Sequence, residues 1–235
     1  IVSYAILLLI MIYGQMLMRS VIEEKSQRIS ETIVSSIKPF QLMSGKLIGI
    51  CSLGITQLFI FGLFVFGVVN FSEPVFAHFG LASSELLEVI GQFQFSGTVF
   101  SFMILFFILG FVFFSSLFAA VGAMVNSEDE GQQFQLPIIF LMIIGFFIMF
   151  TVSRNPDTVR AFWISLIPFF TPLVMFARIA VSDPVLPSGA YLSIFTMVFF
   201  TGVILWAVAK IYRVGILMYG KKPSLKEALK WIRYK

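Results

Sequence analysis

The sequence predicts an all-α, polytopic membrane protein with about five transmembrane helices, a cytoplasmic amphipathic helix and an outer re-entrant helical hairpin. Composition is the first reason, because 59% of the 235 residues are hydrophobic and only 12% are charged, whereas soluble domains carry about 25% charge. The second is the content of 30 phenylalanines, which suits a surface that faces lipid. The third is the recurrence of apolar runs of about 20 residues, the length of helix that crosses a bilayer.

Five apolar runs are long enough to span a membrane, and we expect residues 1–235 to form a single transmembrane domain. The runs are 1–18, 47–69, 99–125, 136–152 and 191–212. Small residues at four-residue spacing let membrane helices approach closely. This spacing predicts helix contacts at Ser115, Ala119 and Ala123, and at Gly45 and Gly49.

The positions of Lys and Arg predict the orientation, because basic residues concentrate in cytoplasmic loops. The segment 70–97 holds neither Lys nor Arg, whereas the tail 213–235 is strongly basic. The segment 19–46 is basic as well, with Arg19, Lys25, Arg28, Lys38 and Lys46. Five spans place the segment 19–46 and the tail together on the cytoplasmic side. The acidic stretch 126–135, expected there as a loop, fits less well, but acidic residues contribute little to orientation.

The apolar stretch 162–181 is interrupted by Pro168, Pro172 and Arg178. A sixth span here would send the basic tail outside, and an arginine deep in lipid costs about 2.5–3.5 kcal/mol. We therefore expect residues 161–182 to form a re-entrant or interfacial hairpin on the outer side. A kinked sixth span is the alternative.

The segment between the first two spans has the pattern of an amphipathic helix. At 100° per residue, one face collects four isoleucines: Ile22, Ile29, Ile33 and Ile37. Glu24, Arg28 and Glu31 fall on the opposite face at spacings of four and three, which lets Arg28 pair with both carboxylates. Pro39 prevents a simple continuation of the helix. We expect the apolar face to lie against the membrane domain and the charged face to meet a partner; a solvated connecting helix without a partner is the alternative.

The run 23–49, EEKSQRISETIVSSIKPFQLMSGKLIG, resembles the loop of ABC exporter permeases of the type-two membrane family, most closely the sodium-efflux and drug-efflux branch. Gln57, the run 132–137 and the turn 170–172 agree as well. By this resemblance, residues 23–37 form the coupling helix that docks on a separate ATPase subunit. The ATPase-coupling residues would be Glu23, Glu24, Lys25, Arg28, Glu31, Ser35, Ser36 and Pro39.

The resemblance also implies the assembly. Such permeases have about six spans, and a first span and often a large external domain precede the others, so this chain would lack that N-terminal part. They work as homodimers or heterodimers in a prokaryotic cell membrane, here with a cytoplasmic C-terminus. Their substrates include sodium and drugs. An outer hairpin before the last span occurs in them too, in agreement with the reading of 161–182.

No ATP site is expected in the chain itself, because the pattern G-x-x-x-x-G-K-[ST] does not occur. Gly45-Lys46 is followed by Leu47, and Phe40 stands where the earlier glycine would be. We expect no cofactor and no enzymatic activity, so hydrolysis of ATP would belong to the partner. His78 is the only histidine, which excludes a histidine-based metal cluster and a Ser-His-Asp triad.

The tail predicts a second amphipathic helix that lies on the membrane surface. Ser224 and Glu227 form a capping box after Pro223. Its lipid-surface residues would be Lys226, Lys230, Trp231 and Arg233. A basic amphipathic helix of this kind binds an anionic bilayer, and a nucleic-acid partner is excluded because the basic residues adjoin a span.

Two other functions compete with an ATP-driven exporter permease. A secondary transporter or channel would need buried charges or broken helices at the membrane midplane, and the middles of the five runs hold no Asp, Glu, Lys or Arg. A membrane anchor or assembly protein without transport activity is the other alternative, and the sequence leaves it open.

Overall fold

The structure, a computed structural model, describes residues 2–27, 39–78, 97–182, 187, 189–216 and 218. Every regular element among them is a helix. In chain order these are α1 (Val2–Ser26), α3 (Pro39–His78), α5 (Gly97–Met124), α6 (Glu128–Phe134), α7 (Leu136–Arg154), α8 (Val159–Ser165), α9 (Thr171–Val181) and α10 (Ala190–Gly215). Five of them, namely α1, α3, α5, α7 and α10, are long and apolar enough to cross a membrane. The predicted fold class is therefore confirmed.

Helix boundaries differ from the predicted runs mainly at the first and second spans. The first run was expected to stop at Met18, but α1 continues to Ser26 because Val21 and Ile22 stay buried. The second was expected from Leu47, but α3 begins eight residues earlier, at Pro39. A proline suits the first turn of a helix, where its missing N–H has no intrahelical acceptor.

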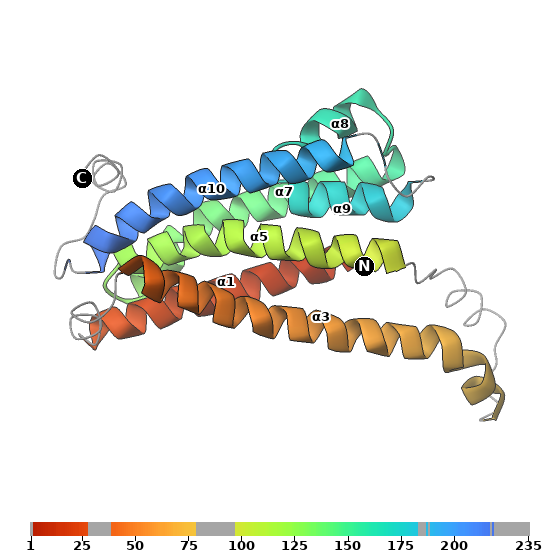
Figure 1. Ribbon diagram of the computed structural model, residues 1–235, viewed down its shortest axis with the longest axis horizontal. Helices are drawn as coiled ribbons and strands as arrows, with labels where there is room; N and C mark the ends of the chain where they lie inside the picture. Colours follow the sequence, from red (N-terminus) through yellow and green to blue (C-terminus); the bar gives the residue numbers. More distant parts are fainter. Residues whose placement is uncertain are drawn as a thin grey trace.

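The five spans run alternately between two ends of an elongated bundle (Figure 1). One end gathers the last turns of α1, α5 and α10 with the first turns of α3 and α7, and α6 lies there; we call it the α6 end. The opposite end, with α8 and α9, is the hairpin end.

Charged side chains of the described residues lie within about two turns of a helix end. Those at the α6 end are Arg19, Glu23, Glu24, Lys25, Lys46, Glu128, Asp129, Glu130, Lys210 and Arg213. The middle of the bundle is thus free of described charges, as a hydrocarbon layer requires. The hairpin end also carries two exposed arginines, Arg154 and Arg160. The orientation was predicted from the basic residues of 19–46, 70–97 and the tail, so these two arginines did not enter it. The orientation therefore stays a prediction.

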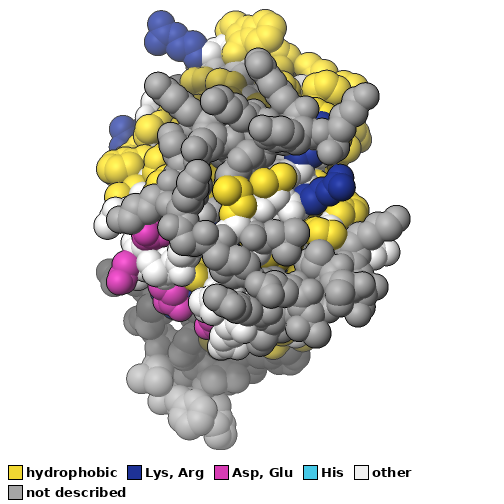
Figure 2. All heavy atoms as spheres, turned by 90° about the vertical axis from the view of Figure 1, so that its left-hand side faces the viewer, with side chains coloured by type: hydrophobic (Ala, Val, Ile, Leu, Met, Phe, Trp, Pro, Cys, Tyr) yellow, Lys and Arg dark blue, Asp and Glu magenta, His cyan; other side chains and the backbone are white. Residues whose placement is uncertain are grey.

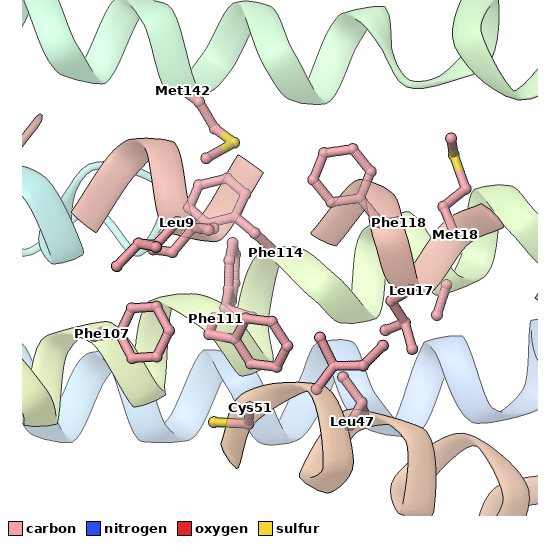
Figure 3. Packing of buried hydrophobic residues seen from close by; sticks show 14 of the residues in the cluster. Leu9, Leu17, Met18, Leu47, Cys51, Phe107, Phe111, Phe114, Phe118 and Met142 are labelled. Atoms are coloured by element: carbon pink, nitrogen blue, oxygen red, sulfur yellow. The ribbon is translucent and has the colours of Figure 1, made fainter. Parts of the chain in front are cut away.

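Helix α5 is the centre of the bundle. Of its most apolar stretch, 67% is buried, compared with 22% for α3, α7 and α10. Its interior is built from fully buried rings: Phe106, Phe107, Phe111, Phe113, Phe114 and Phe118. Figure 3 shows several of these rings among side chains from α1, such as Leu17, and from α3, such as Leu47. The outer spans instead present large apolar side chains outward, as lipid-facing helices do.

Small residues let α5 approach its neighbours closely. Ser115, Ala119 and Ala123 are fully buried, so the predicted contact face is confirmed. A Cβ added at Gly122 would lie 2.8 Å from the carbonyl oxygen of Met18, which only glycine avoids. Gly45 and Gly49 were expected to make similar contacts, and this was wrong. No described atom lies within 4 Å of a Cβ built at either glycine, because this part of α3 turns that face outward.

Residues 161–182 form α8, a turn and α9. Helix α9 has 11 residues, too few to cross a hydrocarbon core of about 30 Å. The last turn of α7 and the first turn of α10 both lie at the hairpin end (Figure 1), so the chain enters and leaves the bundle on one side. This arrangement agrees with a re-entrant hairpin rather than a sixth span; that the hairpin faces outward stays a prediction.

A fully buried arginine holds the hairpin together. Arg178, on α9, donates from Nε to the carbonyl oxygen of Pro156 at 2.8 Å and from Nη1 to Ser165 Oγ at 2.9 Å. Thr171 donates to the carbonyl oxygen of Ser165 at 3.0 Å. Burial lowers the pKa of the Arg178 guanidinium, and the carboxylate of Asp157 opposes that shift. The charge that argued against a sixth span is thus enclosed by polar acceptors at the hairpin end.

The close approach of α1 and α5 gives a stability prediction with a control in the same chain. Gly122→Ala would force a methyl group against the Met18 carbonyl and lower the free energy of unfolding by about 1–3 kcal/mol, the usual cost of overpacking. Gly202→Ala, on α10, meets open space and would be neutral or stabilising by up to about 1 kcal/mol, because alanine favours helix. Denaturation of both variants in detergent measures this, and equal stabilities would contradict the packing described.

Candidate coupling site at the α6 end

The predicted coupling residues fall partly within the described chain. Glu23, Glu24 and Lys25 lie in the last turn of α1 and Pro39 starts α3. The rest of that set, Arg28, Glu31, Ser35 and Ser36, lies outside the described residues. So do the predicted membrane-surface residues Lys226, Lys230, Trp231 and Arg233. The structure therefore describes this end through α1 and α3, the two helices that flank the segment.

Glu24 is bound to the neighbouring span instead of standing on a free charged face. Its carboxylate forms an ion pair with Lys46 Nζ on α3 at 2.7 Å, and the two side chains are only 23% and 13% exposed. Lys46 Nζ also donates to the carbonyl oxygen and to Oγ of Ser20, at 3.0 and 2.9 Å. One ammonium group thus joins α1 to α3 beside the segment that connects them. Glu24 was expected to lie with Arg28 and Glu31 on a charged face that is free to meet a partner. For Glu24 this was wrong, because its carboxylate is paired with Lys46.

Lys25 points into the bundle, where its side chain is 1% exposed. Its Nζ donates to the carbonyl oxygen of Ala123 at 2.8 Å. Ala123 lies in the last turn of α5, whose final carbonyls have no intrahelical donor and carry the negative end of the helix dipole. The carboxylate of Glu130 on α6 adds an electrostatic attraction. Lys25 therefore caps α5 from α1, a role that the sequence did not suggest.

The acidic stretch 126–135, expected to be a loop, contains helix α6. Ser127 caps its start by accepting from the backbone N–H of Glu130 at 3.4 Å, and Glu130 Oε2 accepts from the N–H of Asn126 at 3.1 Å. Acidic residues in a first turn suit the positive end of a helix. The pattern S-x-x-E at 127–130 is the capping signal that could have predicted this helix.

Helix α6 is fixed against α1. A Cβ at Gly131 would lie 2.9 Å from Cδ1 of Ile22, so the two helices touch. Glu23, Glu128 and Asp129 are exposed at this end. Figure 2, which views the molecule from the α6 end, shows acidic side chains gathered on one side and Lys and Arg side chains elsewhere. The end surface is thus divided by charge.

These contacts make the α6 end a rigid junction. The segment that follows α1 is flanked by helices tied to one another through Lys46, and α1 is tied to α5 through Lys25. A displacement of this segment would therefore move three spans together. Within the described ranges, no group of three or more His, Cys, Asp or Glu side chains could hold a metal ion.

Comparison with known proteins gives matches along nearly the whole chain. Residues 1–208 match the family described as ABC-2 family transporter protein. The uncharacterized protein YhaP of Bacillus subtilis is 32% identical over 232 residues, which cover 96% of this chain and 52% of YhaP. The uncharacterized protein MJ1024 of Methanocaldococcus jannaschii is 25% identical over 220 residues, covering 91% of this chain and 48% of MJ1024.

The chain thus spans about half the length of these curated relatives. No solved structure matches it significantly.

The tie between α1 and α3 gives a prediction for a double-mutant cycle. Glu24→Gln and Lys46→Met each remove the ion pair while keeping similar side-chain volumes. Because the pair is largely buried, we expect a coupling energy of about 1 kcal/mol in the free energy of unfolding. Strictly additive effects would mean that the two side chains do not interact. The Asp129→Asn and Lys46→Met cycle is the control, since Asp129 lies on α6 and makes no ion pair with Lys46.

Proposed function

This chain belongs to the ABC-2 transporter family, and from that membership we propose that it is the permease subunit of an ATP-driven exporter. It is a multi-pass membrane component of an ABC-2 family transporter. In the proposal, a separate ATPase subunit supplies the energy and binds the segment 23–37 at the α6 end. That end would face the cytoplasm of a prokaryotic cell, and the permease would work as a homodimer or heterodimer.

The observation that carries the proposal is that the helices flanking this segment are bonded to each other and that α1 is bonded to α5. An ATPase can move the spans of a permease only if the segment to which it binds is mechanically joined to those spans. Lys46 links α3 to two acceptors on α1, the Ser20 side chain and backbone, and to the Glu24 carboxylate. Lys25 links α1 to the end of α5. A docked ATPase would therefore act on the central helix as well as on the two flanking spans.

The energetic logic is a shift between two arrangements of the bundle. ATP binding would favour one position of the bound ATPase. The spans would follow because α1, α3 and α5 are joined at the junction. Such a shift needs no ATP site on this chain. Lys46, which follows Gly45 in the sequence, is engaged with Glu24 and Ser20 in a helix and thus not in a phosphate-binding loop.

Charge at the α6 end supports the same partner. Glu23, Glu128 and Asp129 are exposed there, and an acidic surface attracts a basic patch on an approaching protein and speeds their association. A secondary transporter finds less support, because the described charges lie near the helix ends rather than at midplane. The substrate would be one handled by related exporters, such as sodium or a drug.

Reversal of charge in the segment tests the docking. The variant Arg28→Glu, Glu31→Lys in the full-length protein leaves Glu23, Glu24 and Lys25 in place, so the internal ties and the outward face of α1 remain. Electrostatic repulsion should then lower recovery of the ATPase at least tenfold, which corresponds to about 1.4 kcal/mol. Recovery is measured after solubilisation of native membranes, as ATP hydrolysis by the purified protein and as the amount of copurified polypeptide with a nucleotide-binding motif.

The control is Arg154→Glu with Arg160→Glu, because both residues are exposed at the opposite end. This control should keep the ATPase. Undiminished ATPase in the segment variant, or equal loss in both, would refute docking at the α6 end.

A further inference from the structure

The outward face of α1 carries polar side chains one turn apart. Gln15, Arg19 and Glu23 are spaced by four residues, so they share one face of the helix. Ile12 and Met16, which adjoin Gln15 and Arg19 on this side of the helix, are 58% and 47% exposed. Together with Ser20, these five residues line a surface hollow of about 510 Å³. The hollow runs from the α6 end toward the middle of the span.

None of these three side chains forms an ion pair or a hydrogen bond within the described part of the chain, although the Glu23 carboxylate attracts the Lys46 ammonium electrostatically. Arg19 and Glu23 form no ion pair there, although they are only one turn apart, and Gln15 makes no side-chain hydrogen bond. Three exposed polar side chains of α3 do have partners: Gln57 Oε1 accepts from Tyr13, and Ser52 and Thr56 donate to backbone carbonyls of their own helix.

The outward faces of α7 and α10 differ. At comparable depth, α7 presents Phe140, Ile144 and Phe147, and α10 presents Phe199 and Val203. Gln15 lies four residues further from the α6 end than Arg19, about 6 Å deeper along the helix at 1.5 Å per residue. Unpaired polar side chains at this depth face protein or water rather than lipid. The polar face of α1 is therefore less suited to lipid than the outward faces of α7 and α10.

We propose that the polar face of α1, formed by Gln15, Arg19 and Glu23, is the contact surface for a second copy of this permease. The inference rests on the proposed function and deepens it by naming the face at which two copies meet. The hollow would then lie between the copies and open at the α6 end.

Charge complementarity supports a second copy as the occupant. In a dimer with its two-fold axis along the membrane normal, the same residues of both copies meet at equal depth. Arg19 of one copy would then lie one turn, about 6 Å along the axis, from Glu23 of the other. Their long side chains span that offset, so each copy supplies both charges of two equivalent pairs. Gln15 would face its own counterpart, and two amides can donate to and accept from each other.

Cysteine cross-linking of the full-length protein in native membranes tests the proposal. Gln15→Cys and Arg19→Cys are each introduced into a background without other cysteines, with Cys51→Ala included. Controls are Ile144→Cys on α7 and Val203→Cys on α10, which are 46% and 45% exposed. Mild oxidation with copper phenanthroline should give at least fivefold more covalent dimer for the α1 positions than for the controls.

A charge swap provides a second measurement that does not depend on cysteine chemistry. Arg19→Glu would place carboxylates against Glu23 of the other copy and weaken dimerisation at least tenfold, measured by light scattering of the purified protein. Arg19→Glu with Glu23→Arg restores opposite charges and should restore the dimer.

Dimer formation through Ile144→Cys or Val203→Cys but not through α1 would overturn the proposal. Absence of any covalent dimer would overturn it too, as when a different protein segment or a different permease covers α1. ATPase copurifying with a protein that does not cross-link through α1 would refute this surface and leave the proposed function standing. Absence of ATPase from the unmodified protein would refute the proposed function instead.

Discussion

Two lysine ammonium groups at the α6 end determine how the spans are joined there. An ammonium group near a membrane interface must find acceptors, and the backbone carbonyls at helix ends are acceptors without donors. Lys25 takes such a carbonyl oxygen, that of Ala123, whereas Lys46 takes the carbonyl oxygen of Ser20, inside α1, together with the Glu24 carboxylate. Each lysine lies on one helix and its acceptors lie on another. The same contacts that satisfy the charges therefore connect α1, α3 and α5 across the bundle.

Packing around α5 extends this connection along the membrane. Helices in lipid have little hydrophobic drive to associate, so close contact has to come from shape. The buried rings of α5 fill the space between α1, α3 and α7, and Gly122 lets the backbone of α1 approach it directly. A displacement of the segment after α1 would thus be transmitted directly to the core, because α1 and α5 are in close contact. This is the physical basis for proposing that an ATPase acts on this bundle from the α6 end.

The sequence predicted the spans well because the length of an apolar run is fixed by the bilayer. It placed the end of α1 too early, since Arg19 and Glu23 interrupt the apolar run, although helix continues wherever one face stays buried. Lys25 follows Met18, Val21 and Ile22 on that buried face, and this phase could have predicted its inward position. The partners of Glu24 and Lys25 lie on other helices, so spacing along one segment could not reveal them. Helix α6 was missed even though Ser127 and Glu130 form a capping pattern.

The account depends most on the α6 end facing the cytoplasm, where ATP is available. Gln27, the exposed residue that follows α1, reports on this end directly. In a background without other cysteines, Gln27→Cys is treated with a membrane-impermeant maleimide in intact cells and in inside-out vesicles. We expect labelling in the vesicles and protection in the cells. Labelling in intact cells would place the junction outside and contradict the proposal that an ATPase binds there.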